Sequence, residues 1–432
     1  MLFKLFLLTL LNAPSLEVIK SPADFAAKLS QTSQSAISFR IRSDANVIAE
    51  TKPTNRPTDK PTSFIRPLTP KAVIERLFTT KLQKNWFAAE FLAQVSTDQI
   101  EAIIASLKPL LGTYKQVKES GENYVVIGER GTLPVTIALN DRGQISGLYF
   151  GNPSINDVKD VVKGFKDLPG QVGLLVMEET SPRITIDEDT PLAVGSAFKL
   201  AVLKALKAQI ASGKRTWSEA ISLKAKHKVL PTGILQTWPE GSQLTIQSVA
   251  SLMISQSDNT ATDMLIDLVG RETIEAIATR NRPLLTLREF FVLKSSQNSE
   301  LLKRYHSSSE AERRSLLMEL AKLPLPKAEE LSLIPSIELE AEWFLTNREL
   351  CNLIEDVADL PLMSINPGVA NPKDWERIAF KGGSDMGVLN LTTWLKAKSG
   401  KTYCVSATWN NTTVLEEAKF FSLYSALLES LK

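Results

Sequence analysis

A proline-rich stretch at residues 51–70 is the feature that most limits how this chain can fold. Its sequence, TKPTNRPTDKPTSFIRPLTP, holds five prolines and five threonines but no glycine. Proline fixes φ and lacks a backbone donor, so such a segment cannot form the interior of a helix or a sheet. We expect an extended, semi-rigid linker here, with folded domains after it. The preceding residues, 14–50, are expected to be partly ordered.

The first 13 residues, MLFKLFLLTLLNA, combine one lysine with an apolar run. The run is shorter than the roughly 20 residues that a membrane-spanning helix needs. It has the length of a signal-peptide core, about 7–15 residues, and Ala13 is small enough for a cleavage site. We therefore expect residues 1–13 to be a signal peptide and the protein to be exported, periplasmic or secreted, without stable membrane insertion. The alternative is a buried apolar element in a cytoplasmic protein.

Residues 71–153 have the pattern of a small α+β domain, and 432 residues leave room for a second, larger one. Two helical patterns are followed by three strand-like runs with glycine-containing turns between them. In outline the pattern is similar to the cystatin-like and NTF2-like folds. We expect this domain to be non-catalytic; the alternative is a ligand pocket on the concave face of its sheet. The expected helices are residues 72–78 and 100–111, and the expected strands are 123–128, 133–139 and 145–150.

Residues 160–432 read as one larger domain with strands at both ends and helices between them. The early strands are expected at 172–177 and 183–187, and the closing strands at 379–381, 387–397 and 402–409. A helix at 196–212 ends at a glycine, and an amphipathic helix closes the chain at 415–431. This order predicts a sheet assembled from the two ends of the domain.

Composition excludes several kinds of chemistry. The formal net charge of +2 gives no electrostatic reason to expect a nucleic-acid partner. Only two histidines and two cysteines are present, and they form no Cys/His zinc cluster pattern, no C-x-x-C pair and no disulfide framework. Neither histidine lies near a nucleophile-elbow pattern, so a Ser-His-Asp triad is not expected.

Ser196 and Lys199, in GSAFK, form the only S-x-x-K in the chain. At the start of a helix this spacing puts both side chains on one face, so the amine can reach the hydroxyl. A desolvated lysine can remove the serine proton, and the helix N-terminus favours negative charge at the serine. Taken alone, the pair could equally be a helix-start serine followed by a solvated lysine.

Two further motifs follow in the chain. Ser257-Asp258-Asn259 lies between two helical stretches, where it could place a hydroxyl and a carboxamide in a cleft or simply cap a helix. Lys381-Gly382-Gly383-Ser384 puts a lysine on a strand, followed by glycines that let a ligand approach the backbone.

In the order S-x-x-K, S-D-N and K-x-G, the three motifs together resemble the class A β-lactamase and penicillin-binding-protein superfamily. The resemblance covers roughly residues 170–432. With the small preceding domain, the whole chain is similar to the two-domain β-lactamase-like proteins of clavulanic acid gene clusters. It implies an α+β fold: an antiparallel sheet flanked by a helical cluster.

The resemblance also implies roles for particular residues. Ser196 would be the acylated nucleophile and Lys199 its general base. Ser257 would relay a proton to the leaving nitrogen, and Lys381 would attract the substrate carboxylate and tune Ser257. No metal or cofactor is required.

Substrate binding would fall to a second set of residues. Asn259 would hold the substrate's side-chain amide. The backbone amides of Ser196 and Ser384 would form the oxyanion hole beside Gly383. Trp238 would stand at the mouth of the cleft; the alternative is a packing tryptophan.

The sequence departs from the family at two points. Gly382 stands where the family usually has Thr or Ser, which removes one carboxylate contact. The Glu and Asn that activate the deacylating water in efficient class A enzymes have no clean match between Asn259 and Lys381. Glu289 is nearest in position and is the candidate deacylation base, with Lys199 as the alternative; a charged stretch at 295–330 is inserted after it.

The function expected from these motifs is that of a serine hydrolase acting through a Ser196 acyl-enzyme on β-lactams or related esters and amides. Two alternatives stay open: a D-alanyl-D-alanine peptidase acting on peptidoglycan peptides, and a non-catalytic sensor that stays acylated. In each case the partner is a small molecule or a peptide, and we expect a monomer.

Overall fold

The computed structural model describes residues 68–121, 123–229, 231–326, 339 and 341–432. The expected signal peptide, the region 14–50 and residues 51–67 of the proline-rich stretch lie outside these residues. The described chain forms two compact units, and the division falls inside two helices, α6 (Val158–Lys166) and α16 (Glu417–Glu429). Residues 68–161 group with Phe421–Leu431, and Val162–Phe420 with Lys432. The last helix is therefore divided, whereas the sequence pattern places all of residues 160–432 in one domain.

The smaller unit packs helices against an antiparallel sheet of strand order β1-β2-β3-β4, with β5 paired to β3. Thr69 caps the first helix and Pro70 occupies its first turn. A capping box of Ser96 and Gln99 starts the longest one. The elements are α3 (Pro70–Thr79), η1 (Lys84–Trp86), α4 (Ala89–Leu92), α5 (Thr97–Leu111), β1 (Tyr114–Ser120), β2 (Asn123–Gly128), β3 (Gly131–Leu139), β4 (Ile145–Phe150) and β5 (Ser154–Ile155).

Both helices and all three strands expected in this unit are present. The sequence pattern missed β1, YKQVKES, because only Val117 of this strand is buried and its polar residues hide the alternation. The α+β class is confirmed, whereas the similarity to cystatin-like and NTF2-like folds stays a prediction.

The larger unit is built on a five-stranded antiparallel sheet of order β12-β13-β14-β6-β7. Its strands come from both ends of the unit, as the sequence order predicts, and the edge strand β12 carries the K-G-G-S motif. The strands are β6 (Gln171–Glu178), β7 (Ser181–Ile186), β12 (Trp375–Asp385), β13 (Val388–Ala397) and β14 (Thr402–Asn410). Four short strands form two further antiparallel pairs: β8 (Leu192–Ala193) with β11 (Phe344–Leu345), and β9 (Ala220–Ser222) with β10 (Gln243–Thr245).

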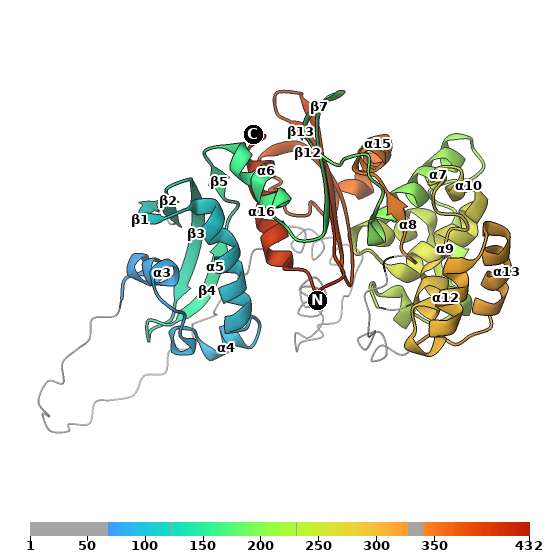
Figure 1. The fold of residues 1–432 in the computed structure, drawn as a ribbon, viewed down its shortest axis with the longest axis horizontal. Coiled ribbons are helices and arrows are strands. Elements are labelled where there is room, and N and C mark those ends of the chain that lie inside the picture. The colour runs from blue at the N-terminus through green and yellow to red at the C-terminus, as the bar shows by residue number, and fades with distance from the viewer. Residues whose placement is uncertain (1–67, 122, 230, 327–338, 340) are drawn as a thin grey trace, which may run out of the picture. The chain divides into compact units, whose positions relative to one another are not determined.

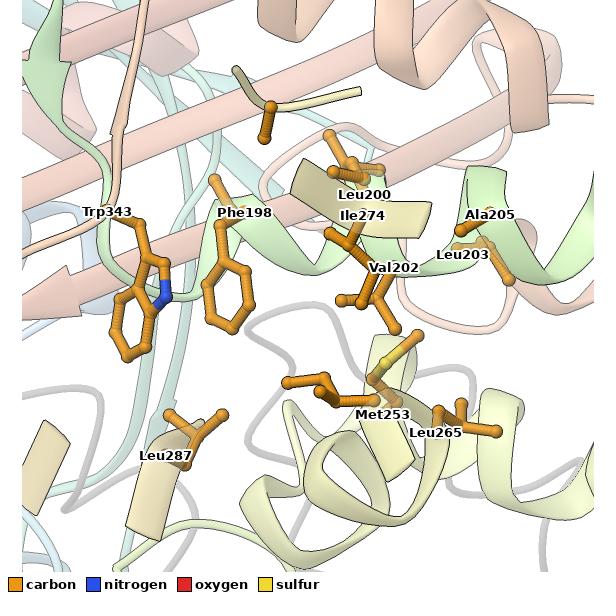
Figure 2. Packing of buried hydrophobic residues seen from close by; sticks show 14 of the residues in the cluster. Phe198, Leu200, Val202, Leu203, Ala205, Met253, Leu265, Ile274, Leu287 and Trp343 are labelled. Atoms are coloured by element: carbon orange, nitrogen blue, oxygen red, sulfur yellow. The ribbon is translucent and has the colours of Figure 1, made fainter. Parts of the chain in front are cut away.

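A cluster of helices lies on one side of this sheet (Figure 1). Helix α7 is buried on nearly every side at its centre, and Figure 2 shows its residues Leu200, Val202 and Leu203 within the apolar core. The helical segments are η2 (Gly195–Phe198), α7 (Lys199–Ala211), η3 (Ala225–His227), η4 (Leu235–Thr237), α8 (Ile246–Ser255), α9 (Asn259–Val269), α10 (Arg271–Glu275), α11 (Leu287–Leu293), η5 (Ser296–Asn298), α12 (Ser299–Ser307), α13 (Glu310–Leu320), α15 (Asn347–Val357) and η6 (Pro361–Ser364). None of the helices in the described ranges is both long and apolar enough to cross a bilayer.

Two details differ from expectation. The helix expected at 196–212 begins only at Lys199, because Gly195–Phe198 forms a 3₁₀ turn. The two cysteines, too few for a disulfide framework, nevertheless form one disulfide: Cys351 on α15 bonds to Cys404 on β14, with Cα atoms 5.7 Å apart. Only one pairing of two cysteines is possible, but their separation of 53 residues did not indicate whether the bond forms.

Candidate active site

Ser196 lies in the turn η2, between the short strand β8 and helix α7. Its neighbours Gly195 and Ala197 are buried, while Ser196 itself is partly exposed. Phe198 anchors the turn, because its ring stacks on that of Trp343 with centroids 4.1 Å apart (Figure 2). A partly exposed hydroxyl on an anchored turn is a suitable position for a nucleophile.

Lys199, the first residue of α7, is fully buried. Its Nζ donates hydrogen bonds to the Ser257 carbonyl oxygen (2.7 Å), to Ser257 Oγ (3.1 Å) and to Asn259 Oδ1 (2.8 Å). These bonds bring the S-x-x-K and S-D-N motifs together across about sixty residues of chain. Among the hydrogen bonds of the described residues, those of Lys199 Nζ go to the S-D-N turn and not to Ser196 Oγ.

Burial changes the acid–base behaviour of both motif lysines. It lowers the pKa of Lys199 well below its usual value, and the charge of Lys381 lowers it further, while Asp258 and Asp263 oppose the shift. Burial also lowers the pKa of Lys381 to about 7. The lowered pKa of Lys199 favours the neutral amine, which is the form that a general base requires.

Ser257 is held in a conformation that few residues adopt. Its φ is 55°, in the left-handed region, which typically costs a non-glycine residue about 1–3 kcal/mol. Its carbonyl oxygen accepts from Thr232 Oγ1 (2.8 Å), and its Oγ accepts from Lys381 Nζ at 3.1 Å. The Ser257 hydroxyl thus lies between the two lysines, where it can pass a proton.

Asp258, the middle residue of S-D-N, is a structural clamp. It caps α9 by accepting from Ala261 N (2.8 Å), and its other oxygen accepts from Ile234 N (2.7 Å) and Leu235 N (3.0 Å). It fastens the segment before Trp238 to the S-D-N turn. Trp238 is 38% exposed, but nothing in the structure tests its assignment to the cleft mouth.

Strand β12 and the turn η2 approach each other so closely that only glycine fits at the contact. A Cβ at Gly383 would lie 2.0 Å from Val194 O and 2.7 Å from Ser196 N. A Cβ at Gly195, whose φ is 48°, would lie 2.9 Å from Ser384 N. The backbone amides of Ser196 and Ser384 are therefore neighbours, the arrangement that an oxyanion hole requires.

Glu289, the candidate deacylation base, is engaged elsewhere. Its carboxylate accepts two hydrogen bonds from Arg271 (3.0 and 2.7 Å) and one from Thr286 N (2.8 Å), closing a capping box at the start of α11. It also lines a cavity of about 410 Å³ whose walls include neither Ser196 nor Lys199. These contacts favour a structural role, and its part in deacylation stays a prediction.

Other polar groups near the site were missed in the sequence. Asp263, one helical turn after Asn259, accepts from Leu287 N (2.8 Å) and Arg288 N (3.0 Å), and burial raises its pKa to about 7. Lys294 forms a buried ion pair with Asp385, the residue directly after Ser384. Of this pair, Asp385 could be noticed in the sequence because it directly follows the K-G-G-S motif, whereas Lys294 lies 91 residues from it.

The comparisons with known proteins agree with the motifs. Residues 153–320, which contain Ser196, Lys199 and the S-D-N turn, match the model of the beta-lactamase enzyme family. The resemblance to the β-lactamase family is thereby confirmed for residues 153–320, together with the β-lactamase-like fold of this region. Similarity to the two-domain proteins of clavulanic acid gene clusters stays a prediction. No curated protein matches the chain.

Among solved structures, the chain is similar to a β-lactamase from Sphaerobacter thermophilus DSM 20745, with 21% identity, a TM-score of 0.45, and coverage of 64% of this chain and 97% of that one. A β-lactamase from Chitinophaga pinensis DSM 2588 gives 16% identity and a TM-score of 0.45, covering 63% of this chain and 98% of that one. PBP-A gives 15% identity and a TM-score of 0.43, covering 63% and 95%.

Proposed function

We propose that the larger unit forms an acyl-enzyme at Ser196 with β-lactams or related activated esters and amides. The observation that carries the proposal is the environment of Lys199. A buried amine with a lowered pKa, hydrogen-bonded to Ser257 Oγ and to Asn259, is the base that a serine nucleophile needs when no histidine is at hand.

In the proposed reaction, neutral Lys199 takes the proton of Ser196 as the Oγ–carbon bond forms at the acyl carbon. The carbonyl oxygen becomes an oxyanion, stabilised by the amides of Ser196 and Ser384; one such donor is typically worth about 3–4 kcal/mol. The bond to the leaving nitrogen or oxygen then breaks. The proton passes from Lys199 through Ser257 to the leaving atom, a route supported by the 3.1 Å separation of Nζ and Oγ.

Lys381 has two proposed roles. In its protonated form it attracts the substrate carboxylate, and through its bond to Ser257 Oγ it orients the hydroxyl that relays the proton. Since Gly382 offers no hydroxyl, recognition of the carboxylate depends more heavily on this single charge.

The direct test is intact-mass spectrometry after incubation with penicillins, cephalosporins and activated esters. We expect an adduct on the wild type and none on Ser196→Ala. Ser255→Ala is a matched control, because Ser255 lies at the end of α8 and its Oγ only donates to the Ser251 carbonyl. No adduct on the wild type, or the same adduct on Ser196→Ala, would refute the proposal.

Turnover separates the hydrolase from its two alternatives. Nitrocefin, a simple ester and a D-Ala-D-Ala peptide are assayed on one preparation. Turnover of the first two supports a hydrolase, and preference for the peptide supports a peptidase. Inertness toward all three while Ser196 still acylates supports a sensor.

We further propose that the protein is exported. The disulfide between Cys351 and Cys404 supports this, because disulfides persist in oxidising compartments and are rare in the cytosol. Expression of the full chain in a bacterial host should give a periplasmic or secreted product that lacks residues 1–13. An unprocessed cytoplasmic product with free thiols contradicts the proposal.

A further inference from the structure

Three titratable side chains form a largely buried cluster beside the candidate oxyanion hole. Lys294, at the end of α11, places its Nζ 2.6 Å from Asp385 Oδ2 and 3.3 Å from Glu342 Oε1. The three side chains are 2%, 23% and 0% exposed for Lys294, Asp385 and Glu342 respectively. Segments far apart in the sequence thus meet at a single ammonium group.

One cation cannot neutralise two carboxylates, and the pKa values of the two acids shift in opposite directions. Burial raises the pKa of Glu342 well above its usual range, against the pull of Lys294. Burial would also raise the pKa of Asp385, but the charge of Lys294 and hydrogen bonds to the carboxylate lower it. The two shifts therefore favour a proton on Glu342 and a negative charge on Asp385, the carboxylate that lies closer to Lys294 Nζ.

The cluster is connected to both proposed oxyanion donors. On one side, Asp385 is the last residue of β12 and directly follows Ser384. On the other side, Glu342 directly precedes Trp343, whose carbonyl oxygen accepts from Val194 N (2.9 Å), two residues before Ser196.

Aromatic rings pack against the Lys294 side chain of this cluster. Lys294 Nζ lies 4.8 Å from the centre of the Phe290 ring, and that ring lies 4.6 Å from Trp343. Trp343 in turn stacks on Phe198, two residues after the nucleophile (Figure 2). The ammonium is thus held in place by rings as well as by carboxylates.

We propose that Lys294 is a positioning residue: through Asp385 and Glu342 it holds the end of β12 against the turn before Ser196, and so fixes the spacing of the two oxyanion amides. The inference rests on the proposed acylation. A buried ion pair is a poor source of stability, because the desolvation penalty can exceed the Coulombic gain. Its place beside the two amides makes geometric control the role that the structure supports.

The test compares an ester with the matching thionoester, because sulfur is larger than oxygen and a fixed pair of amides discriminates against it. In Lys294→Met we expect acylation by the ester to fall about 10–100-fold, with a much smaller change for the thionoester, so that the ester-to-thionoester ratio collapses. Lys294→Arg keeps the charge and should restore most of the ratio.

Arg314→Met is the matched control, since it removes the partner of another buried carboxylate, Glu275, on α10. It should lower the melting temperature without changing the ratio. An unchanged ratio in folded Lys294→Met overturns the inference. If that variant does not fold, the same measurement on Asp385→Asn decides: a collapsed ratio supports the inference and an unchanged one overturns it. Absence of any Ser196-dependent adduct on the wild type refutes the proposed function instead.

Discussion

The two units of this protein bury very different material. In the described part of the smaller unit, the buried polar residues are Ser106 and Ser425, and neither is charged. The larger unit buries lysines, aspartates and glutamates, among them Lys199, Lys381 and Glu342. Because a buried charge is costly unless it is paired, its presence in one unit and absence from the other marks where chemistry is expected.

The cavities agree with this contrast. The smaller unit holds a cavity of about 130 Å³, lined by Phe78, Leu111 and Val126 among others. Binding sites for small molecules typically have about 300–1,000 Å³. This cavity is smaller than such sites, and both the non-catalytic role of the smaller unit and the alternative ligand pocket on its sheet stay predictions.

The largest effect is expected at Lys199, a buried lysine of the larger unit. We expect Lys199→Met to lower the rate of acylation by about 10²–10⁴-fold, because the general base is lost. The same substitution removes the donor from which the buried Ser257 and Asn259 oxygens accept, so the free energy of unfolding should fall by about 1–3 kcal/mol. Single-turnover acylation and chemical denaturation measure the two effects. A folded variant that acylates normally contradicts the assignment.

Matched core substitutions, one in each unit, test whether acylation depends on the larger unit alone. Leu133 on β3 and Leu203 on α7 are both fully buried, one in each unit, and each change to Ala should cost about 2–5 kcal/mol. We expect acylation to be unchanged in Leu133→Ala and reduced in Leu203→Ala, because Leu203 lies one helical turn after Lys199. Calorimetry and acylation rates measure both variants. Slower acylation in folded Leu133→Ala gives the smaller unit a role in catalysis.

The sequence predicted the fold well where the pattern is local. Helix ends marked by glycine, strand runs between turns and each of the three motifs are patterns that span only a few residues. Their assembly into one site followed from the family resemblance, which gave Ser196, Lys199 and Ser257 roles in one reaction; the bonds of Lys199 to the S-D-N turn were found only in the structure. The division of α16 between units did not follow, because an apolar pattern predicts that a helix is buried but not which unit it packs against.

The parts of the site that were missed depend on contacts distant in sequence. Lys294 and Asp385 are 91 residues apart, and Cys351 and Cys404 are 53 apart. Neither separation indicates that the two residues of the pair are in contact. Asp263 was visible next to the S-D-N motif, but its bonds to the start of α11 required knowing how that helix packs on α9.

The pH dependence tests the larger unit's second buried lysine. With a folded pKa of about 7, Lys381 is protonated below that pH and loses its charge above it. For a substrate with a carboxylate, kcat/KM should therefore fall about tenfold per pH unit above about 7, whereas a neutral ester should show no such fall. Both should decline on the acid side, where Lys199 becomes protonated. Identical alkaline limbs for the two substrates exclude Lys381 from carboxylate recognition.

The smallest effect is expected at Glu289. Its bidentate bond to Arg271 and its capping of α11 indicate that its carboxylate serves the fold, so Glu289→Gln should leave deacylation unchanged and lower the free energy of unfolding by about 1–3 kcal/mol. Single-turnover kinetics give the deacylation rate, and denaturation gives the stability. Arg271→Gln is the matched control, since it breaks the same ion pair from the other side and should be destabilising to a similar degree. If Glu289→Gln instead traps the acyl-enzyme while Arg271→Gln does not, Glu289 is the deacylation base. Unchanged deacylation in both leaves Lys199 as the base for both halves of the reaction, and the larger unit would then use one buried amine where its relatives divide the work between a lysine and a glutamate.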